Sequence, residues 1–380
     1  MSLPLPAAGG VLTIDTDAIA ANWLQLKSLL ASGTSCAATI KADAYGTGAA
    51  RTARRLAEAG CETFCVALPA EGIEVRNAVP TARIFILNGL FPGTAELLSA
   101  NRLIPVLGSM EEIADWAAHC RAAATRHPAA IHVDTGMNRL GLRPDAFAAV
   151  MSDAAATRDF EIVLLMTHLA CGSEPEHPMN AHQLARFREA TAPYAHIPRS
   201  MANSAGVLMG RDFHFDMARP GISLYGGKAL DTVANTMQPV VKIEGRVMTL
   251  RDVPAGETVG YAAARTTTRP TRIAMVSAGY ADGMHRRAGS TDAEPGGYGF
   301  AAGQRVPLFG RISMDMMAFD VTDLPEGTLD RGSLVEILGP NVAASDLASY
   351  AQTIDYEYLT GLGKRYARHY GALTATGTTG

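Results

Sequence analysis

Short apolar runs rich in β-branched residues alternate with amphipathic stretches through the first half of the chain. The alternation repeats about eight times and stops near Gly227. The apolar runs predict strands at residues 36–41, 61–67, 82–88, 103–107, 129–134, 161–168, 199–203 and 214–218. Segments such as 110–126 and 180–194 are rich in Ala, Leu, Glu and Arg, which favour helix. An eightfold alternation of this kind predicts an N-terminal (β/α)8 barrel.

The first amphipathic stretch predicts a helix that begins at Asp15 or Thr16, either of which is a suitable N-cap. One face of this helix carries apolar side chains at helical spacing, namely Ile19, Trp23, Leu26 and Leu30. From Met237 onward the pattern changes to Val-, Thr- and Gly-rich alternation, which predicts strands at 240–243, 271–277, 319–321 and 334–338. In this half only residues 344–353 are predicted to be helical. The chain is therefore expected to be an α/β protein with a TIM-like barrel over residues 1–238 and a mostly-β domain over residues 239–380.

Composition narrows the class of partner. The chain has 380 residues with 48% hydrophobic content, which agrees with two domains. Its 33 Lys and Arg against 37 Asp and Glu give a net charge of -4. This balance argues against nucleic acid or an anionic membrane as the partner, and it leaves a small metabolite. No signal peptide or membrane-spanning run is recognised, and the five cysteines form no CxxC pair, so a cytoplasmic protein with reduced cysteines is expected.

Lys41 directly follows the first apolar run and opens the segment Lys41-Ala42-Asp43-Ala44-Tyr45-Gly46. A lysine at the end of a strand, with its stem in a dry interior, loses its proton more easily than a free lysine does. Its neutral amine is then a Schiff-base nucleophile, which points to an aldehyde cofactor. The alternative is a lysine that extends to the rim of the sheet and only reaches solvent.

Polar residues also follow the later barrel strands: Arg139 after the fifth, His168 after the sixth, Asn203-Ser204 after the seventh and Arg219-Pro220-Gly221-Ile222 after the eighth. The C-terminal ends of barrel strands form one rim, where barrel enzymes carry their active sites. Asn203-Ser204 together with Gly221 is typical of a phosphate cradle. Taken singly, each residue has another interpretation: an ordinary N-cap for Asn203-Ser204, surface salt bridges for Arg139 and Arg219, and a core histidine for His168.

Seven motifs, in order along the chain, give it a resemblance to the pyridoxal-phosphate-dependent alanine racemase family over essentially its whole length. They are Lys41-Ala42-Asp43-Ala44-Tyr45-Gly46, Asp134-Thr135-Gly136-Met137, Asn203-Ser204, Arg219-Pro220-Gly221, Gly279-Tyr280-Ala281-Asp282-Gly283, Arg311-Ile312-Ser313-Met314-Asp315 and Ile354-Asp355-Tyr356-Glu357. The resemblance implies that L- and D-alanine are interconverted by two bases, Lys41 and Tyr261, through an external aldimine of pyridoxal 5'-phosphate. The D-alanine is either a peptidoglycan precursor or a compound to be degraded, and the sequence leaves this choice open.

The resemblance also implies roles for the other matching residues. Those expected to bind the cofactor are Lys41, Tyr45, His168, Asn203, Ser204, Arg219, Gly221, Ile222 and Tyr356. Arg139 and Met314 would bind the substrate carboxylate, with His132, Tyr280 and Asp315 in support. Family members are homodimers with shared active sites, so Tyr261, Met314 and Asp315 would act in the neighbouring subunit's site.

One position departs from the family pattern. Where relatives commonly carry a lysine, often carbamylated, the chain has His132, two residues before Asp134-Thr135-Gly136-Met137. Histidine forms no comparable stable carbamate, so Arg139 is expected to be positioned by an anion such as chloride or by another side chain. A neutral His132 that only fills space beside Arg139 is the alternative.

Other activities remain open at this stage. The same fold could act as a broad-specificity or serine racemase, a pyridoxal-dependent decarboxylase or a D-amino-acid aldolase. A non-catalytic pyridoxal-phosphate carrier is the alternative from a different class, against which the second domain argues. No metal is expected, because the spacing of His168, Cys171, His177 and His182 matches no standard ligand pattern.

Overall fold

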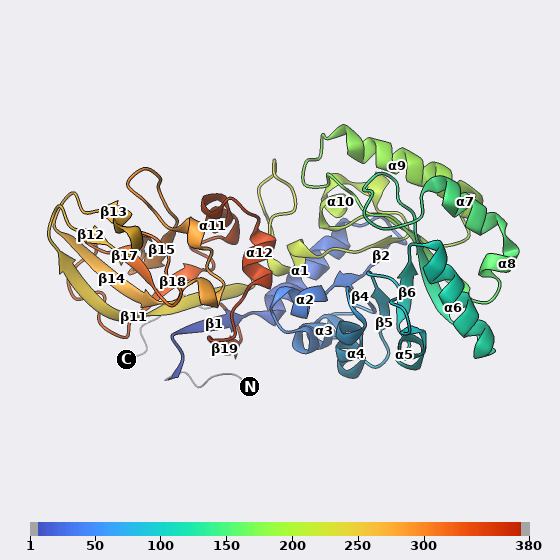
Figure 1. Ribbon diagram of the computed structural model, residues 1–380, viewed down its shortest axis with the longest axis horizontal. Helices are drawn as coiled ribbons and strands as arrows, with labels where there is room; N and C mark the ends of the chain where they lie inside the picture. Colours follow the sequence, from blue (N-terminus) through green and yellow to red (C-terminus); the bar gives the residue numbers. More distant parts are fainter. Residues whose placement is uncertain (1–6, 374–380) are drawn as a thin grey trace. The chain divides into compact units, whose positions relative to one another are not determined.

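A computed structural model describes residues 7–373 of the chain. It forms two compact units, drawn in Figure 1. The barrel unit comprises residues 19–237. The β unit combines the segment that precedes Ile19 with the residues from Gln238 onward.

The barrel unit is built on parallel strands that follow the sequence order. They are β2 (Ser35–Cys36), β3 (Ala38–Thr39), β4 (Thr63–Val66), β5 (Arg83–Ile86), β6 (Ile104–Leu107), β7 (Pro128–His132), β8 (Glu161–Met166), β9 (Arg199–Ser200) and β10 (Met217–Ala218). Strands β3 to β9 form a 7-stranded sheet, in which each strand pairs with the next. Strand β10 pairs in parallel with β2, just before β3. The residues that flank β10 donate backbone hydrogen bonds to the β9 side, from Asp216 N–H to the Arg199 carbonyl at 3.0 Å and from Arg219 N–H to the Ala202 carbonyl at 2.8 Å. The ring is thereby closed, and the predicted (β/α)8 barrel is confirmed.

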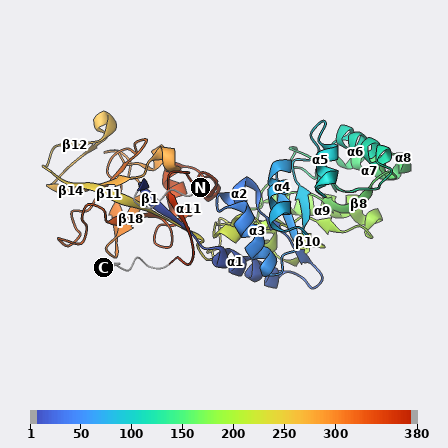
Figure 2. The same cartoon turned by 90° about the horizontal axis from the view of Figure 1, so that it is seen from below.

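Helices alternate with these strands along the chain. They are α1 (Thr16–Leu29), α2 (Lys41–Tyr45), α3 (Ala49–Glu58), α4 (Pro69–Ala78), α5 (Ala95–Ala100), α6 (Met110–Ala122), α7 (Pro144–Ser152), α8 (Ala154–Thr157), α9 (Pro178–Thr191) and α10 (Ser204–Met209). Figure 2 shows α6, α7 and α8 gathered at one end of the barrel unit. The carboxylate of Asp15 accepts a hydrogen bond from the Ala18 N–H at 2.8 Å, which confirms the predicted N-cap of α1.

Apolar side chains fill the interior of the barrel. The buried cluster comprises Ala37, Cys65, Phe85, Ile104, Val106, Ala130, Leu164, Met166 and Met217. Eight of these residues come from six strands, β4 to β8 and β10, and Ala37 lies between β2 and β3. The interior is therefore a packed core, which leaves the rim of the barrel for chemistry.

The β unit is mostly sheet. Its strands are β1 (Gly10–Ile14), β11 (Val241–Val253), β12 (Thr258–Val259), β13 (Arg265–Thr266), β14 (Thr271–Ser277), β15 (Tyr298–Ala301), β16 (Gln304–Pro307), β17 (Met317–Asp320), β18 (Leu334–Leu338) and β19 (Ala367–Tyr370). The main sheet has the order β16-β15-β18-β11-β1-β19, and β14 joins it by pairing with β11 and with β17. The unit also contains α11 (Ala344–Ala351), as predicted, and the short α12 (Asp355–Thr360), which was not predicted because its sequence lacks a helical apolar pattern.

Strand β1 belongs to the β unit, although the sequence pattern places all of residues 1–238 in the barrel. It pairs with β11 in antiparallel register, for example Leu12 with Ile243, and with β19 in parallel register. The partners of β1 therefore lie more than two hundred residues along the chain, and local hydrophobic periodicity carries no information about such pairing.

Short 3-10 turns complete both units: η2 (Ala192–Tyr194), η3 (Arg211–Phe213), η4 (Ile222–Tyr225), η5 (Tyr261–Ala263), η6 (Tyr280–Asp282) and η7 (Arg286–Ala288). Within residues 7–373, the helices are too short or too polar for any of them to cross a membrane.

Candidate active site

Lys41 lies at the end of the first barrel strand and opens a turn of unusual handedness. The four residues after it, Ala42 to Tyr45, have φ between 52° and 55°, which is the left-handed helical region. For residues with a Cβ atom this conformation costs roughly 1–2 kcal/mol each. Backbone bonds from Ala44 N–H to Ile40 O at 3.0 Å and from Gly46 N–H to Ala42 O at 2.9 Å stabilise the turn.

The amine of Lys41 is poised to lose its proton. The side chain is half-buried, and this burial lowers the pKa of the amine below its ordinary value. The positive charge of Arg139 lowers the pKa further, whereas Glu71 and Cys65 oppose the shift. The direction agrees with the prediction that Lys41 is a stronger nucleophile than a solvated lysine.

Arg219 directly follows β10 and is only 4% exposed. Its guanidinium donates to the Thr167 carbonyl at 2.7 Å and to the Ser200 hydroxyl. Burial lowers the pKa of Arg219 to about 10, so the group keeps its charge at neutral pH. The interpretation of Arg219 as a surface salt bridge is therefore wrong.

Two histidines lie in the field of these cations. His132 ends β7 and is buried, and its burial together with the charge of Arg219 lowers its pKa to about 4. Burial first, and then the charges of Arg219 and Arg139, lower the pKa of His168 well below its ordinary value. Both imidazoles are therefore neutral at pH 7, and the positive charge beside them comes mainly from the two arginines.

Arg139 is carried by a loop that leaves and rejoins β7. The Asp134 N–H donates to Leu142 O and the Leu142 N–H donates to His132 O, both at 2.8 Å, so the two ends of the loop are bonded side by side. The Asp134 carboxylate also accepts the N–H groups of Gly136 and Asn138, each at 3.0 Å.

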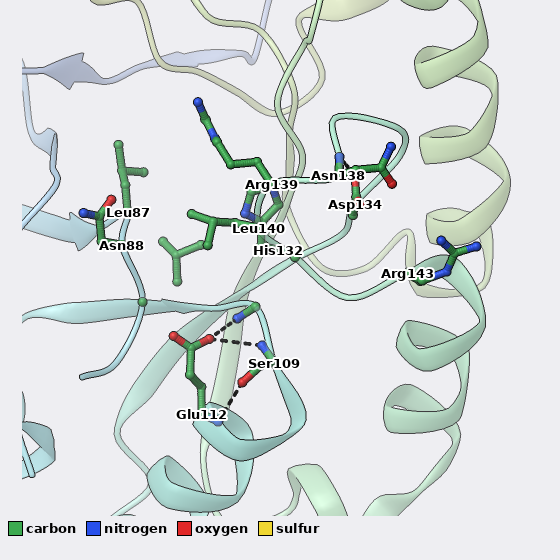
Figure 3. A pocket seen from close by; sticks show the side chains of 14 residues that line it. Leu87, Asn88, Ser109, Glu112, His132, Asp134, Asn138, Arg139, Leu140 and Arg143 are labelled. Atoms are coloured by element: carbon green, nitrogen blue, oxygen red, sulfur yellow. Dashed lines mark hydrogen bonds between the residues drawn. The ribbon is translucent and has the colours of Figure 1, made fainter. Parts of the chain in front are cut away.

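The side chain of Arg139 is exposed and lines a pocket of about 490 Å³ together with His132. Figure 3 shows Arg139 extending from the loop on the side away from Arg143. The opposite wall of this pocket includes Glu112, whose carboxylate bonds to the turn at Ser109. Arg139 is thus available to an anionic ligand that enters the rim.

Hydroxyl groups converge at the start of η4, next to Arg219 in the chain. The Ser204 oxygen accepts hydrogen bonds from the N–H groups of Gly221 at 2.9 Å and Ser223 at 3.2 Å, which leaves its proton to be donated. Among residues 7–373, the buried Ser223 hydroxyl finds no hydrogen-bond partner. Asn203 accepts from Gly206 N–H at 3.0 Å, so it serves as the N-cap of α10.

Tyr45 adds a phenol to this group. Its ring stacks on Tyr225 with centroids 4.5 Å apart, and Tyr225 in turn donates to the Thr39 carbonyl at 3.1 Å. A Cβ atom at Gly221 would lie 2.6 Å from the Tyr45 hydroxyl, so a side chain there would displace the phenol. Tyr45, Ser204 and Ser223 form a set of hydroxyl groups that suits a phosphate.

The remaining predicted residues lie in the β unit and are exposed. Tyr261 opens η5 after Gly260, and 69% of its surface is accessible. Met314 is 52% exposed, Tyr280 is 42% exposed and Tyr356 is 36% exposed. These four side chains are therefore accessible in the single chain.

Arg365 lies outside the seven motifs and connects two of them through their aspartates. Arg365 bonds through two nitrogens to the two carboxylate oxygens of Asp282, and through a third to Asp315, all at 2.7 Å. The Ala281 N–H donates to the Met314 carbonyl at 3.0 Å, so the two motifs are also joined through their backbones. Asp315 therefore has a supporting partner that nothing in the sequence pattern indicated.

Glu71 is the second residue that sequence reasoning missed. It lies in the first turn of α4, and its carboxylate accepts the Ala42 N–H at 2.7 Å. The only signal in the sequence was a Glu two residues after Pro69, which is typical of a helix start and says nothing about a distant contact.

His177, one of the histidines near Cys171, has a structural role. His177 caps α9 by accepting the Met179 N–H at 3.2 Å. In the part of the chain that the structure describes, no three His, Cys, Asp or Glu side chains are arranged to hold a metal ion.

Two protein-family models together match most of the chain. Residues 14–229 match the alanine racemase N-terminal domain, and residues 240–370 match the alanine racemase C-terminal domain. The chain belongs to the alanine racemase family. The predicted family resemblance is confirmed over nearly the full length.

Two relatives named alanine racemase match this family member over nearly its full length. It is 44% identical over 367 residues to the alanine racemase of Rhodospirillum rubrum, with 96% of this chain and 97% of the relative covered. It is 45% identical over 370 residues to the alanine racemase of Rhizobium meliloti, again with 96% and 97% covered.

A solved structure shares the fold. The crystal structure of alanine racemase from Bartonella henselae with covalently bound pyridoxal phosphate matches with a TM-score of 0.89 and 38% identity, covering 96% of this chain and 99% of that chain. The predicted combination of a barrel with a β-rich domain is thereby confirmed.

Proposed function

We propose that the chain is an alanine racemase that interconverts L- and D-alanine with the help of pyridoxal 5'-phosphate. The observation that carries the proposal is a half-buried Lys41 with a lowered pKa on the same barrel rim as a set of phosphate-binding donors. Family membership supports the same reaction, because the full-length relatives are named alanine racemase.

The rim residues fit the cofactor. The buried and unbonded Ser223 hydroxyl, with Ser204 and Tyr45, would hold the phosphate. Lys41 would hold the aldehyde carbon, and Arg219 and His168 would lie beside the ring. When bound, pyridoxal phosphate supplies the electron sink that makes the α-proton of an amino acid acidic.

Racemisation requires that a proton leaves one face of the α-carbon and that another arrives on the opposite face. Lys41 is proposed to handle the proton on one face and Tyr261 on the other. Burial and Arg139 lower the pKa of Lys41, which increases the fraction of neutral amine that can accept a proton at neutral pH. Arg219 keeps its charge and its proton there, because its pKa of about 10 lies well above neutral pH.

Arg139 and the backbone N–H of Met314 are proposed to bind the substrate carboxylate. Arg139 is exposed on its loop and lines the pocket beside His132. Because His132 is neutral at pH 7, it supplies no negative charge to hold Arg139, so a bound anion such as chloride is proposed to do so before substrate arrives.

We further propose a homodimer with shared active sites. Tyr261, Met314 and Tyr280 are exposed in the single chain, as a surface that completes a neighbour's site would be. Asn203, Ile222 and Tyr356 are proposed to contact the cofactor phosphate, and Asp315 would hold Met314 in place through Arg365.

A reducing compartment such as the cytoplasm suits the chain, because all five cysteines are free and four of them are buried. The negative net charge offers no support for a nucleic-acid partner. Relatives named biosynthetic and catabolic match almost equally, at 43% and 44% identity, so similarity favours neither direction of the conversion.

Circular dichroism of L-alanine solutions tests the proposed reaction. The purified protein should carry the yellow absorbance of bound pyridoxal phosphate, and the L-alanine signal should decay to zero. Persistent optical activity with bound cofactor would contradict the proposal and support a carrier. Equal rates with L-serine would favour the broad-specificity alternative.

A further inference from the structure

Glu71 connects two loops at the barrel rim. One carboxylate oxygen accepts the Ala42 N–H at 2.7 Å, and the other accepts the N–H groups of Ala67 at 2.8 Å and Leu68 at 3.0 Å. The last two bonds cap the start of α4, as a Glu in the first turn commonly does. The first bond has a different function, because it reaches the segment after the preceding strand.

That segment is the left-handed turn that carries Lys41. Ala42 follows Lys41 directly, so its N–H belongs to the peptide group that leaves the Lys41 Cα atom. Four consecutive residues with positive φ store strain in this turn. A hydrogen bond from a backbone N–H to a charged carboxylate is stronger than one to a neutral acceptor, and it offsets part of that strain.

The charged groups around Lys41 come from several elements. Arg139 on the loop after β7 disfavours the protonated amine, whereas Glu71 on α4 and Cys65 on β4 favour it. His168, after β8, lies in the field of the same amine and is neutral at pH 7. Of the groups that shift the pKa of Lys41, Glu71 is the one that supplies a carboxylate.

We propose that Glu71 is a positioning residue for Lys41: it holds the peptide group next to the lysine, and its negative charge opposes the effect of the Arg139 cation on the amine. In the racemase reaction Lys41 must both accept and return a proton, so its affinity for that proton has to be balanced. This role rests on the proposed function, whereas the effect of Glu71 on the amine itself does not.

Glu112 offers a matched control. It occupies the equivalent position in the first turn of α6, where one oxygen accepts the Leu90 N–H at 3.0 Å and the other accepts the Gly108 N–H at 2.5 Å and the Ser109 N–H at 3.1 Å. It therefore joins a loop to a helix start in the same way as Glu71. No lysine adjoins the peptide group that it holds.

The test measures the protonation of Lys41 in the full-length protein after removal of cofactor. The rate of Lys41 acetylation is followed by peptide mass spectrometry as a function of pH in wild type, Glu71→Gln and Glu112→Gln. The labelling midpoint of Lys41 should move to lower pH in Glu71→Gln and should stay in place in Glu112→Gln. An unmoved midpoint in Glu71→Gln, or equal shifts in both variants, would overturn the proposal.

Glu71→Asp covers the case in which Glu71→Gln does not fold. It keeps the charge but shortens the side chain, so the labelling midpoint of Lys41 should stay close to the wild-type value, while the stability in urea decreases. A clear shift of the midpoint to lower pH in folded Glu71→Asp would contradict the charge effect. A protein that binds no pyridoxal phosphate but shows the expected shift would refute the racemase function and leave the role of Glu71 intact.

Discussion

The barrel rim and the β unit supply candidate groups in contrasting ways. At the rim, Arg219 and His132 are buried, and each has a pKa displaced by burial. In the β unit, Tyr261 and Met314 are mostly exposed. The candidate side chains at the barrel rim are therefore already desolvated in the single chain. Those of the β unit stay hydrated unless another molecule covers them.

This contrast separates two kinds of mutational effect. Changes at the rim should alter the stability of the single chain and its dependence on pH, because buried charges and strained backbone contribute to the folding free energy. Changes at the exposed residues of the β unit should alter the reaction and leave the folding free energy almost unchanged.

The largest effect is expected for Tyr261→Phe. Loss of the phenol removes one proton-transfer group, which lowers the racemisation rate by about 10²–10⁴-fold. Because the side chain is 69% exposed, the urea-unfolding free energy should change by less than about 0.5 kcal/mol. Racemisation and unfolding are measured on the same preparation, with Tyr350→Phe as the control that should retain the wild-type rate. A Tyr261→Phe variant with full activity would remove Tyr261 from the reaction.

A pH-dependent effect of intermediate size is expected for His132→Gln. The pKa of His132 is about 4 in the folded chain and about 6.5 when unfolded, so the unfolded state binds the extra proton between these values. Wild-type stability therefore decreases as the pH falls through this window, by about 2 kcal/mol at pH 5 from this residue alone.

His132→Gln should lose this part of the pH dependence. Urea unfolding at pH 7 and pH 5 measures the difference, and the exposed His196→Gln serves as the matched control. If wild type and His132→Gln lose the same stability between the two pH values, the imidazole is not buried in its neutral form.

The smallest effect is expected for Ala42→Gly. Ala42 is exposed and has φ 53°, a conformation that glycine adopts without strain. The substitution should stabilise the chain by about 0.5–1 kcal/mol, whereas Ala50→Gly in α3 should destabilise it by a similar amount. Thermal unfolding compares the two, and a loss of stability in both variants would mean that the left-handed turn is not strained.

Local patterns were sufficient to predict the barrel. Its strands are short apolar runs and its helices are amphipathic, so periodicity locates both, and the eightfold repeat implies closure. The β unit was predicted less completely, because β1 pairs with strands at the far end of the chain and β15 and β16 are short.

The candidate site was also predicted in part. Lys41 and Arg219 are candidates because each follows a predicted strand and matches a family motif. Glu71, Arg365 and Tyr225 were missed because their contributions arise from contacts with residues 29, 50 and 186 positions away, respectively, which no spacing rule reveals. The left-handed turn after Lys41 was missed for another reason, since alanine does not favour that conformation.

Mixing two inactive variants tests most directly the claim that the barrel of one chain and the β unit of another form one active site. Lys41→Ala and Tyr261→Phe chains are unfolded together, refolded and assayed with L-alanine. Random pairing should restore about a quarter of the wild-type rate, because half of the dimers then contain one intact site out of two. If the mixture stays as inactive as the separate variants, both groups act within one chain and the shared-site account is wrong.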